Sequence, residues 1–345
     1  MTDLIDRLAA GDTLSDDEWR FLIEGDYKKQ LLFHKADEIR RQHYGTDVYI
    51  RGLIEISSYC KNDCFYCGIR KSNAKAQRYR LTDEEICQCC DEGYRLGFRT
   101  FVLQGGEDGN DSAERIKKIV CAIKKSHPDC AVTLSLGERS RGDYEIWHWA
   151  GADRYLLRHE TATRSHYEKI HPSYQRFDQR MECLRNLKEI GYQTGAGFMV
   201  GSPFQGTEEL IADMRFLQAF QPHMVGIGPF IPHHDTPFAG YPAGSLERTL
   251  IMVALTRLTL PRALIPATTA LGTIHLQGRE LGLKAGANVV MPNLSPVQVR
   301  AQYSLYDNKA HSGQEAAEGL AALKESVAQA GYRIVESRGD AAEVE

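Results

Sequence analysis

The chain has 345 residues, of which 42% are hydrophobic and 26% are charged, and its formal net charge is −4. These values are typical of a globular protein. They show no basic excess of the kind that nucleic-acid binding requires, and no apolar run reaches the ~18 residues of a membrane span. Residues 1–23 are acidic and amphipathic and lack the basic start and apolar core of a signal peptide. We therefore expect a cytoplasmic protein that binds neither nucleic acid nor membrane.

The predicted elements begin with helices and continue as an alternation of strands and helices. Residues 2–45 are predicted to be helical, because the stretches 13–25 and 27–45 have helical patterns and each ends at a glycine. Beyond them, short apolar runs rich in β-forming residues are separated by helical patterns such as 111–127 and 206–220. The eight predicted strands are 48–57, 100–105, 131–137, 153–159, 193–201, 224–230, 263–270 and 287–293.

Eight strand–helix units predict an α/β fold, a closed (β/α)8 barrel of the TIM type preceded by N-terminal helices. An open doubly wound sheet is the alternative. The predicted organisation is a helical extension at 1–47, the barrel at 48–310, and a C-terminal helix and tail at 311–345, of which the acidic end, 339–345, is expected to fray. The active site of such a barrel lies at the carboxyl ends of its strands, so polar residues at those ends are the candidates for chemistry.

Three cysteines, Cys60, Cys64 and Cys67, follow the first predicted strand within the motif CKNDCFYC. Closely spaced thiolates select zinc or iron–sulfur. A zinc site needs a fourth ligand, for which the C-x-x-C pair Cys87 and Cys90, in a helical pattern, is the available candidate. Three thiolates on a [4Fe–4S] cluster instead leave one iron open, as is needed when a small molecule chelates the cluster. The other six cysteines are expected to be thiols packed as small hydrophobes.

The spacing C-x3-C-x-aromatic-C after the first barrel strand resembles the signature of the radical S-adenosylmethionine (SAM) enzymes. In that family the open iron binds the amino and carboxylate groups of SAM. One electron then cleaves SAM to methionine and a 5′-deoxyadenosyl radical. From about residue 30 to 310 the chain further resembles one subfamily, the HydE maturases of [FeFe]-hydrogenase, through the blocks LQGGED, TLSLGE, RYLLRHETA, GAGFMVGSP, VGIGPFIPHHDTP, IPATTALGT and GANVVMPN. Biotin synthase and methylornithine synthase share the barrel and several blocks, but the combination of LRHETA with PATTALGT is specific to HydE.

The resemblance implies which residues hold the cofactors. The cluster ligands, which are also the catalytic cysteines, are Cys60, Cys64 and Cys67. The implied SAM contacts are Tyr66, Gly105, Gly106, Glu107, Ser135, Glu160, Arg180 and Met199. Tyr66 is expected near the adenine, with the filling of the barrel rim as its alternative. Arg180 is expected to pair with the SAM carboxylate, since a guanidinium fork suits a carboxylate, and its alternative is a solvated charge on a helix surface.

A second set of residues is expected to line a substrate cavity. Arg158 lies two residues before Glu160 and so on the same face of a strand, and a charge inside a barrel is costly unless it is paired. The residues that match HydE cavity positions are Arg51, Gln104, Thr133, Arg158, Met224, Thr268, Thr269, Met291 and Tyr303. For Thr268 and Thr269 the alternative is an ordinary role as β-branched strand residues.

Two further stretches bear on metal content. His233 and His234 would point in opposite directions in an extended chain, so PHHD is expected to be a loop rather than a metal site. Some HydE proteins carry three more cysteines near the end of the barrel, which hold a second cluster. Residues 303–319 of this chain contain no cysteine, so one cluster and no second is expected.

The resemblance implies a radical SAM enzyme that acts in the maturation of the hydrogenase H-cluster on an iron–carbonyl–cyanide–cysteine precursor. It also implies a flavodoxin or ferredoxin as reductant and the maturases HydG and HydF as partners. Two alternatives stay open. One is a related radical SAM mutase or sulfur-inserting enzyme, similar to methylornithine synthase or biotin synthase. The other is a non-enzymatic scaffold that binds iron–sulfur or zinc.

Overall fold

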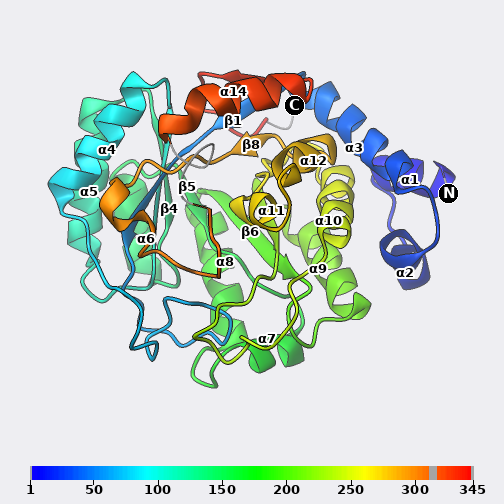
Figure 1. The fold of residues 1–345 in the computed structure, drawn as a ribbon, viewed down its shortest axis with the longest axis horizontal. Helices are drawn as coiled ribbons and strands as arrows, with labels where there is room; N and C mark the ends of the chain where they lie inside the picture. The colour runs from blue at the N-terminus through cyan, green and yellow to red at the C-terminus, as the bar shows by residue number, and fades with distance from the viewer. Residues whose placement is uncertain (1, 311–316, 343–345) are drawn as a thin grey trace.

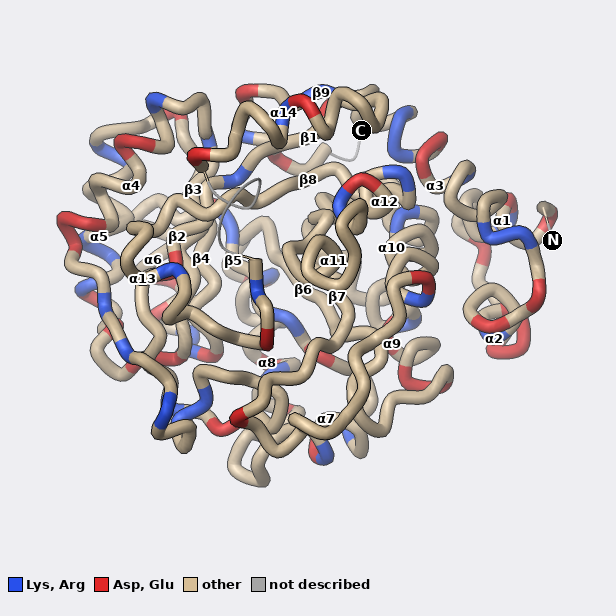
Figure 2. The backbone as a smooth tube through the Cα atoms, viewed as in Figure 1, with Lys and Arg blue, Asp and Glu red and all other residues tan. Residues whose placement is uncertain are grey.

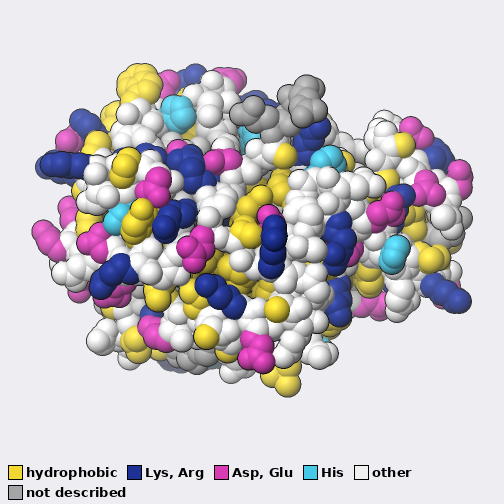
Figure 3. All heavy atoms as spheres, turned by 90° about the horizontal axis from the view of Figure 1, so that it is seen from above, with side chains coloured by type: hydrophobic (Ala, Val, Ile, Leu, Met, Phe, Trp, Pro, Cys, Tyr) yellow, Lys and Arg dark blue, Asp and Glu magenta, His cyan; other side chains and the backbone are white. Residues whose placement is uncertain are grey.

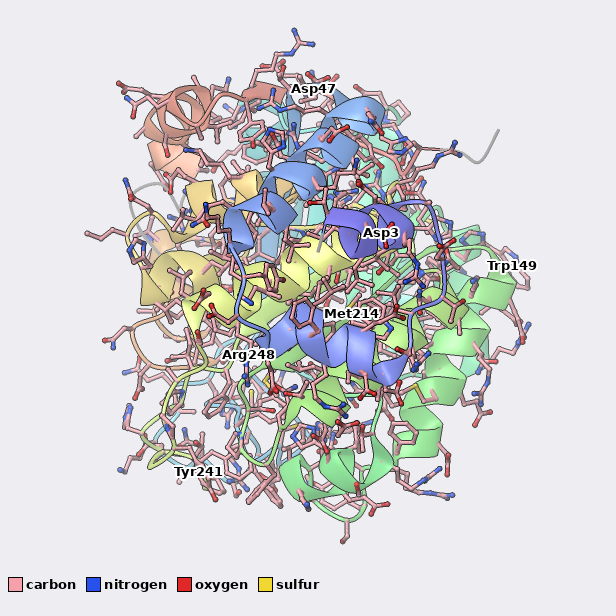
Figure 4. All side chains as sticks on the ribbon, turned by 90° about the vertical axis from the view of Figure 1, so that its right-hand side faces the viewer. Asp3, Asp47, Trp149, Met214, Tyr241 and Arg248 are labelled. Atoms are coloured by element: carbon pink, nitrogen blue, oxygen red, sulfur yellow. The ribbon has the colours of Figure 1, made fainter. Side chains whose placement is uncertain are left out.

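The computed structural model describes residues 2–310 and 317–342 (Figure 1). The chain opens with three helices, α1 (Thr2–Ala9), α2 (Asp16–Glu24) and α3 (Lys29–Tyr44). α2 begins with a capping box, in which Ser15 Oγ accepts from the backbone N–H of Glu18 and the Glu18 carboxylate accepts from the backbone N–H of Ser15. The three helices pack on the outside of the protein against α9 and α10, as Figure 4 shows. The predicted N-terminal helices are confirmed.

The strands form two parallel sheets, and the chain passes from one to the other at Arg51, between β1 and β2. The first sheet has the order β2 (Gly52–Ser57), β3 (Thr100–Gly105), β4 (Ala131–Ser135), β5 (Arg154–Leu156), β6 (Gln193–Val200) and β7 (Met224–Pro229). The second has the order β8 (Val289–Val290), β1 (Asp47–Ile50) and β9 (Arg333–Val335). In the first sheet Gln104 is in register with both Glu55 and Ser135, which brings the carboxyl ends of β2, β3 and β4 to one level.

Isolated parallel bridges connect the two sheets into a ring. Met224 of β7 is bridged to Leu264, Pro266 to Val289 of β8, and Leu53 of β2 to Asn293. Backbone hydrogen bonds of 2.9–3.0 Å accompany these bridges, for example from the N–H of Val225 to the carbonyl of Leu264. Eight hydrogen-bonded segments thus follow one another in chain order, and the predicted α/β barrel is confirmed.

Four predicted strands differ from the structure, by a break or by more than two residues. The eighth, 287–293, is reduced to the two residues of β8. The first, 48–57, is divided at Arg51 because β1 pairs with β8 and β9 whereas β2 pairs with β3. The fourth, 153–159, ends at Leu156. The seventh, 263–270, is wrong as a continuous strand: Pro266 has no N–H for a ladder, and Thr268 is the N-cap of α11 (Thr269–Ile274). Thr268 and Thr269 are therefore not strand residues.

Helices surround the barrel on the outside (Figure 1). They are α4 (Asp83–Arg95), α5 (Ala113–Ser126), α6 (Arg141–Trp149), α7 (Arg164–Ile170), α8 (Phe177–Ile190), α9 (Thr207–Phe220), α10 (Leu246–Thr259), α12 (Gly278–Lys284), α13 (Val297–Arg300) and α14 (Leu320–Gln329), with a 3-10 turn at Ala317–Gly319. Among the helices of the described ranges, none has the length and apolar character that a membrane crossing requires. Positively and negatively charged residues are interspersed along the chain (Figure 2). They are also intermixed on the face that Figure 3 shows.

The C-terminal tail closes the amino end of the barrel instead of fraying. Asp340 forms an ion pair of 2.5 Å with the fully buried Arg154 of β5, and the backbone carbonyl of Arg338 accepts from Thr100 Oγ1 at 2.7 Å. The expectation of a frayed tail is wrong for residues 339–342, because the buried guanidinium needs this counter-charge.

Residues 343–345 and 311–316 lie outside the described residues. The division at 47 and 310 stays a prediction, and β9 was not predicted.

Candidate active site

A cavity of about 370 Å3 lies at the carboxyl ends of the strands and is lined by the cysteine loop. All three cysteines border it. The predicted SAM contacts that line it are Tyr66, Gly105, Gly106, Glu107, Ser135, Glu160, Arg180 and Met199, and the predicted substrate residues that line it are Gln104, Arg158, Thr268, Thr269, Met291 and Tyr303. The structure thus brings these residues together, whereas Arg51, Thr133 and Met224 do not line the cavity. The role of each residue stays a prediction.

The cysteine loop, between β2 and α4, lies directly against the end of β3. A side chain at Gly106 would place its Cβ 2.2 Å from the carbonyl oxygen of Tyr59 and 2.8 Å from Cβ of Cys60, so only glycine permits this approach. The N–H of Lys61 donates to the carbonyl of Glu107 at 2.9 Å, and the N–H of Gly68 donates to the carbonyl of Leu305 at 2.8 Å. The loop is therefore fixed on both sides.

Burial makes the three thiols weak acids in the absence of a cation. Burial raises the pKa of Cys64 to about 12 and also raises the pKa values of Cys60 and Cys67, and the negative charge of the neighbouring thiolates adds to the effect at Cys64 and Cys67. Cys64 Sγ donates to Oε1 of Gln175 at 3.3 Å. A coordinating metal removes such thiol protons outright. The three groups are thus suited to metal ligation rather than to action as free thiolates.

The spacing of the three sulfur atoms exceeds the reach of one zinc ion. Among the described residues, the only group of three or more metal-ligand side chains whose ligand atoms all lie within 4.8 Å of one another is His233, His234 and Asp307. Tetrahedral zinc, with Zn–S bonds of about 2.3 Å, requires sulfur atoms about 3.8 Å apart. Cys87 and Cys90, the candidate additional zinc ligands, lie on α4 and do not line the cavity. The geometry favours a larger cluster over a single zinc ion.

The PHHD stretch is a loop, as predicted, but the reason given for excluding a metal was wrong. The rings of His233 and His234 do not point apart; they stack with centroids 4.4 Å apart. The Nδ1 atom of each ring nevertheless has a partner, since His234 Nδ1 bonds to Asp307 Oδ1 at 2.6 Å and the N–H of Asp235 donates to His233 Nδ1 at 3.1 Å. The hydrogen bond and charge of Asp307 raise the pKa of His234. This cluster ties two loops together.

Arg158 and Glu160 meet at the carboxyl end of β5. Nη2 of Arg158 lies 3.1 Å from Oε2 of Glu160, although the strand that was expected to align them ends at Leu156. The contact is not aligned as a hydrogen bond. Nε and Nη2 of Arg158 and Oε2 of Glu160 therefore have no hydrogen-bond partner within the part of the chain that the structure describes. Buried polar atoms of this kind are costly unless a ligand or water satisfies them.

Arg180 is buried in α8, which excludes the alternative of a solvated surface charge. Its Nε donates to Oε1 of Glu138 and its Nη1 to the carbonyl of Arg158, both at 2.6 Å. Glu138, at the end of β4, was not among the predicted contacts, although it directly follows a predicted strand. The carboxylate of Glu107 accepts from the N–H of Glu138 at 2.9 Å. The carboxylates of Glu138 and Glu107 thus lie near the guanidinium of Arg180. They limit the directions from which a further anionic group can approach it.

Tyr66 is held by a histidine that the sequence did not indicate. The Tyr66 hydroxyl lies 3.0 Å from Nε2 of His171, and Nδ1 of His171 lies 3.0 Å from the carbonyl of Tyr167. Because a carbonyl only accepts, Nδ1 carries the proton, and Nε2 accepts from Tyr66. Burial lowers the pKa of His171 to about 3, so the ring is neutral and this arrangement persists at neutral pH. The aromatic ring of Tyr66 is therefore fixed in orientation.

Beneath the cavity, the barrel encloses Arg51, Thr133 and Met224. Nη1 of Arg51 lies 3.0 Å from Sδ of Met224, while Arg51 Nε and Nη2 and Thr133 Oγ1 have no hydrogen-bond partner among the described residues. Burial lowers the pKa of Arg51. Above them, Glu55 accepts from Nζ of Lys309 at 2.6 Å, and both residues line the cavity. Glu55 and Lys309 were missed because a glutamate within an apolar strand carries no local signal of its partner.

Comparison with known proteins places these features in a family. A family model described as the Radical SAM superfamily matches residues 54–217. The chain is 51% identical, over 81% of its length and 80% of the relative's, to the "[FeFe] hydrogenase maturase subunit HydE" of Thermotoga maritima. The chain belongs to the HydE family of radical SAM enzymes. The resemblance seen in the sequence is confirmed.

This HydE-family chain is also similar, at lower identity, to methylornithine synthases. It is 30% identical, over 86% of its length and 85% of the relative's, to a "3-methylornithine synthase" of Methanosarcina acetivorans. The structure titled "Crystal structure of methylornithine synthase (PylB)" superposes with a TM-score of 0.81 at 26% identity and covers 96% of this chain and 97% of that one. These proteins share the barrel with the chain.

Membership of the radical SAM family implies a [4Fe–4S] cluster and SAM, and the residues fit both groups. Three thiols border one cavity at a spacing too wide for one metal ion. The open atoms of Arg158 and Glu160, of opposite charge, point to a ligand with both cationic and anionic groups, as SAM has.

Proposed function

We propose that this chain is a radical SAM maturase that holds one [4Fe–4S] cluster through Cys60, Cys64 and Cys67. It acts in the assembly of the [FeFe]-hydrogenase H-cluster, on an iron–carbonyl–cyanide–cysteine precursor. The observation that supports this most is the joining of the three cysteines with the open polar atoms of Arg158 and Glu160 in one cavity. When bound, the cluster supplies the electron that cleaves SAM to a 5′-deoxyadenosyl radical.

The chain's own residues bind and orient. Arg180 receives the SAM carboxylate beside Glu138, Glu160 receives a cationic or hydroxyl group, and Tyr66 packs against the adenine. The remaining proposed SAM contacts are Gly105, Gly106, Glu107, Ser135 and Met199. Arg158 in the cavity wall offers guanidinium donors to an anionic substrate, and the other proposed wall residues are Gln104, Thr268, Thr269, Met291 and Tyr303. Arg51, Thr133 and Met224 lie beneath this wall, where Arg51 is a further candidate donor.

The proposed cofactor content is one cluster per chain. No cysteine follows Cys183 in the sequence, although residues 311–316 of the stretch where a second cluster is held in some relatives lie outside the described residues. The proposed reductant is a flavodoxin or ferredoxin. Tyr174 is largely exposed and lines a surface pocket with Lys61 and Asn62, which directly follow Cys60, and this supports entry of the electron on this side. HydG and HydF are the proposed partners, in the cytoplasm.

A second candidate is a radical SAM mutase similar to methylornithine synthase, which the 30% identity to that enzyme over 86% of the chain favours. Both candidates cleave SAM, so the substrate distinguishes them. Anaerobically reconstituted protein with dithionite and SAM should produce 5′-deoxyadenosine. Added to the partner maturases and apo-hydrogenase, it should then restore hydrogen evolution. Formation of 3-methylornithine from an amino-acid substrate, without hydrogenase activation, would contradict the maturase proposal and support the second candidate.

A further inference from the structure

Behind Arg158 and Glu160 lies a buried histidine–aspartate pair that no role proposed above uses. His159 and Asp213 of α9 are both fully buried, and Nε2 of His159 lies 3.2 Å from Oδ1 of Asp213. The N–H of Gly197 in β6 donates to His159 Nδ1 at 3.2 Å. Because Nδ1 accepts this bond, the neutral ring carries its proton on Nε2 and donates it to Asp213. Burial lowers the pKa of His159 to about 3, which keeps the ring neutral.

The same aspartate oxygen holds the chain on the other side of Glu160. The N–H of Ala162 donates to Oδ1 of Asp213 at 2.6 Å, and the N–H of Glu160 itself donates to the carbonyl of Gly197 at 3.0 Å. Asp213 therefore anchors both His159 and Ala162, which flank Glu160. Glu160 has a φ of +66°. A residue other than glycine rarely adopts this left-handed conformation, and it persists only where surrounding contacts hold it.

We infer that His159 and Asp213 are positioning residues that hold Glu160 in its left-handed conformation and thereby aim its carboxylate, together with Arg158, into the cavity. Neither His159 nor Asp213 lines the cavity, so neither touches SAM. The inference rests on the proposed function, because it assigns the pair to the SAM-binding end of the site. It predicts that a change at Asp213, which lies in the outer helix α9, alters SAM affinity without altering the cluster.

The hydrogen bonds also show which property of Asp213 is needed. Oδ1 accepts both bonds, whereas Oδ2 has no hydrogen-bond partner in residues 2–310 and 317–342. The role therefore requires an acceptor oxygen at Oδ1 and no negative charge. Burial raises the pKa of Asp213, in agreement with this. Asparagine provides the same oxygen in the same shape, and alanine removes it.

A matched control lies near the amino end of the barrel. Asn288 is also fully buried, and its Oδ1 also accepts one backbone bond, from Ile265 N–H at 2.9 Å, and one side-chain bond, from Arg257 Nη2 at 3.1 Å. It does not line the cavity. Asn288→Ala thus removes the same number of hydrogen bonds as Asp213→Ala, one from a backbone N–H and one from a side chain, but away from the site. Any general effect of a lost buried acceptor should be common to both variants.

The test measures SAM affinity by isothermal titration, with iron content and melting temperature, on the anaerobically reconstituted full chain. We expect Asp213→Ala to weaken SAM binding about tenfold, the effect of about one lost hydrogen bond, with iron content unchanged. Asp213→Asn should bind SAM like the wild type. Asn288→Ala should lower the melting temperature and leave SAM affinity unchanged.

The inference is overturned if Asp213→Ala binds SAM like the wild type, if Asp213→Asn is as weak as Asp213→Ala, or if Asn288→Ala weakens SAM binding equally. Should Asp213→Ala fail to fold, His159→Phe decides the matter by the same comparison. It keeps the ring contacts with Phe198 and Phe216 but lacks both ring nitrogens. A wild-type chain that does not cleave SAM would contradict the proposed function, whereas normal SAM binding by the variants would contradict this inference alone.

Discussion

Arginines lie at both ends of the barrel. Those near the amino end have acceptors for their guanidinium nitrogens, whereas around the cavity Arg180 is paired with Glu138 but two other arginines are only partly satisfied. Near the amino ends of the strands, the guanidinium of Arg154 bonds to Gln193, Thr100, Arg338 and Asp340, and every nitrogen of Arg257 likewise has an acceptor. Arg158 at the carboxyl end and Arg51 beneath the cavity each retain two nitrogens without a hydrogen-bond partner among the described residues.

The difference separates stability from function within one fold. A satisfied buried ion pair contributes to the stability of the barrel only as long as both partners are present. An unsatisfied buried cation costs folding free energy and is retained where a ligand completes it. The arginine contacts at the amino end therefore stabilise the fold, whereas the open arginine donors around the cavity are available to bind a ligand. Four experiments test this difference between the two ends.

The largest effect is expected from a cysteine at the carboxyl end. Cys64→Ala should abolish both the iron–sulfur absorbance and the formation of 5′-deoxyadenosine, because a [4Fe–4S] cluster held by three thiolates loses a required ligand. Cys130, buried just before β4 at the amino end, is the control, and Cys130→Ala should keep iron content and SAM cleavage. Wild-type rates of 5′-deoxyadenosine formation by Cys64→Ala would show that the cluster assignment is wrong.

The two arginine types should differ in stability when each is replaced by methionine. Arg154→Met should lower the free energy of unfolding by about 2–3 kcal/mol, below the value for a fully buried pair because Asp340 is partly exposed. Arg51→Met should be neutral or stabilising, since it removes an unpaired buried cation and retains apolar volume. Urea unfolding of both variants measures this. If Arg51→Met lowered the free energy of unfolding as much as Arg154→Met does, the two arginines would not differ in their contribution to stability.

Within the carboxyl end, Arg180 and Arg158 should affect SAM unequally. Arg180→Ala should weaken SAM binding tens-fold, since truncating one partner of a buried charged pair costs about 2–5 kcal/mol. Arg158→Ala should weaken it only several-fold, roughly 1 kcal/mol, through its contact with Glu160, and should mainly block hydrogenase activation. Titration with SAM beside an in-vitro maturation assay measures both. Equal losses of SAM affinity would assign Arg158 to the SAM site.

The smallest effect is a pH dependence at the amino end. Burial alone would raise the pKa of Asp340, but the hydrogen bond from Arg338 and the charge of Arg154 lower it to about 2. A carboxyl group with a lowered folded-state pKa contributes stability above its unfolded pKa and loses it as pH falls. Asp340→Asn should therefore reduce the stability difference between pH 5 and about 2. An unchanged acid profile in urea titrations would show that the tail is not held by this ion pair.

The sequence predicted most of the fold and the location of the site, because both depend on local patterns. Apolar runs of strand length predicted seven segments of the ring, and C-x3-C-x2-C placed the three candidate metal ligands after the first of them. The prediction of the seventh strand was wrong because Pro266 has no backbone N–H to donate. The apolar residues around it nevertheless have the pattern of a continuous strand. The ordered C-terminal tail, residues 339–342, was missed because it is stabilised by Arg154, which is distant in sequence.

The supporting contacts of the site could not be predicted from sequence for the same reason. His171, which orients Tyr66, and Glu138, which pairs with Arg180, come from different strand–helix units than the residues they hold. Their relation appears only when the barrel closes. The stacking of His233 on His234 was missed because the loop departs from the extended conformation that was assumed for it.

The central claim is that three cysteines hold one cluster with an open coordination position, facing a cavity that binds SAM. Electron paramagnetic resonance of the reduced, reconstituted protein, with iron quantified on the same sample, tests it most directly. We predict about four irons per chain and one [4Fe–4S] signal whose shape changes when SAM is added. A signal that SAM leaves unchanged, or about eight irons with a second spectroscopic species, would contradict the account.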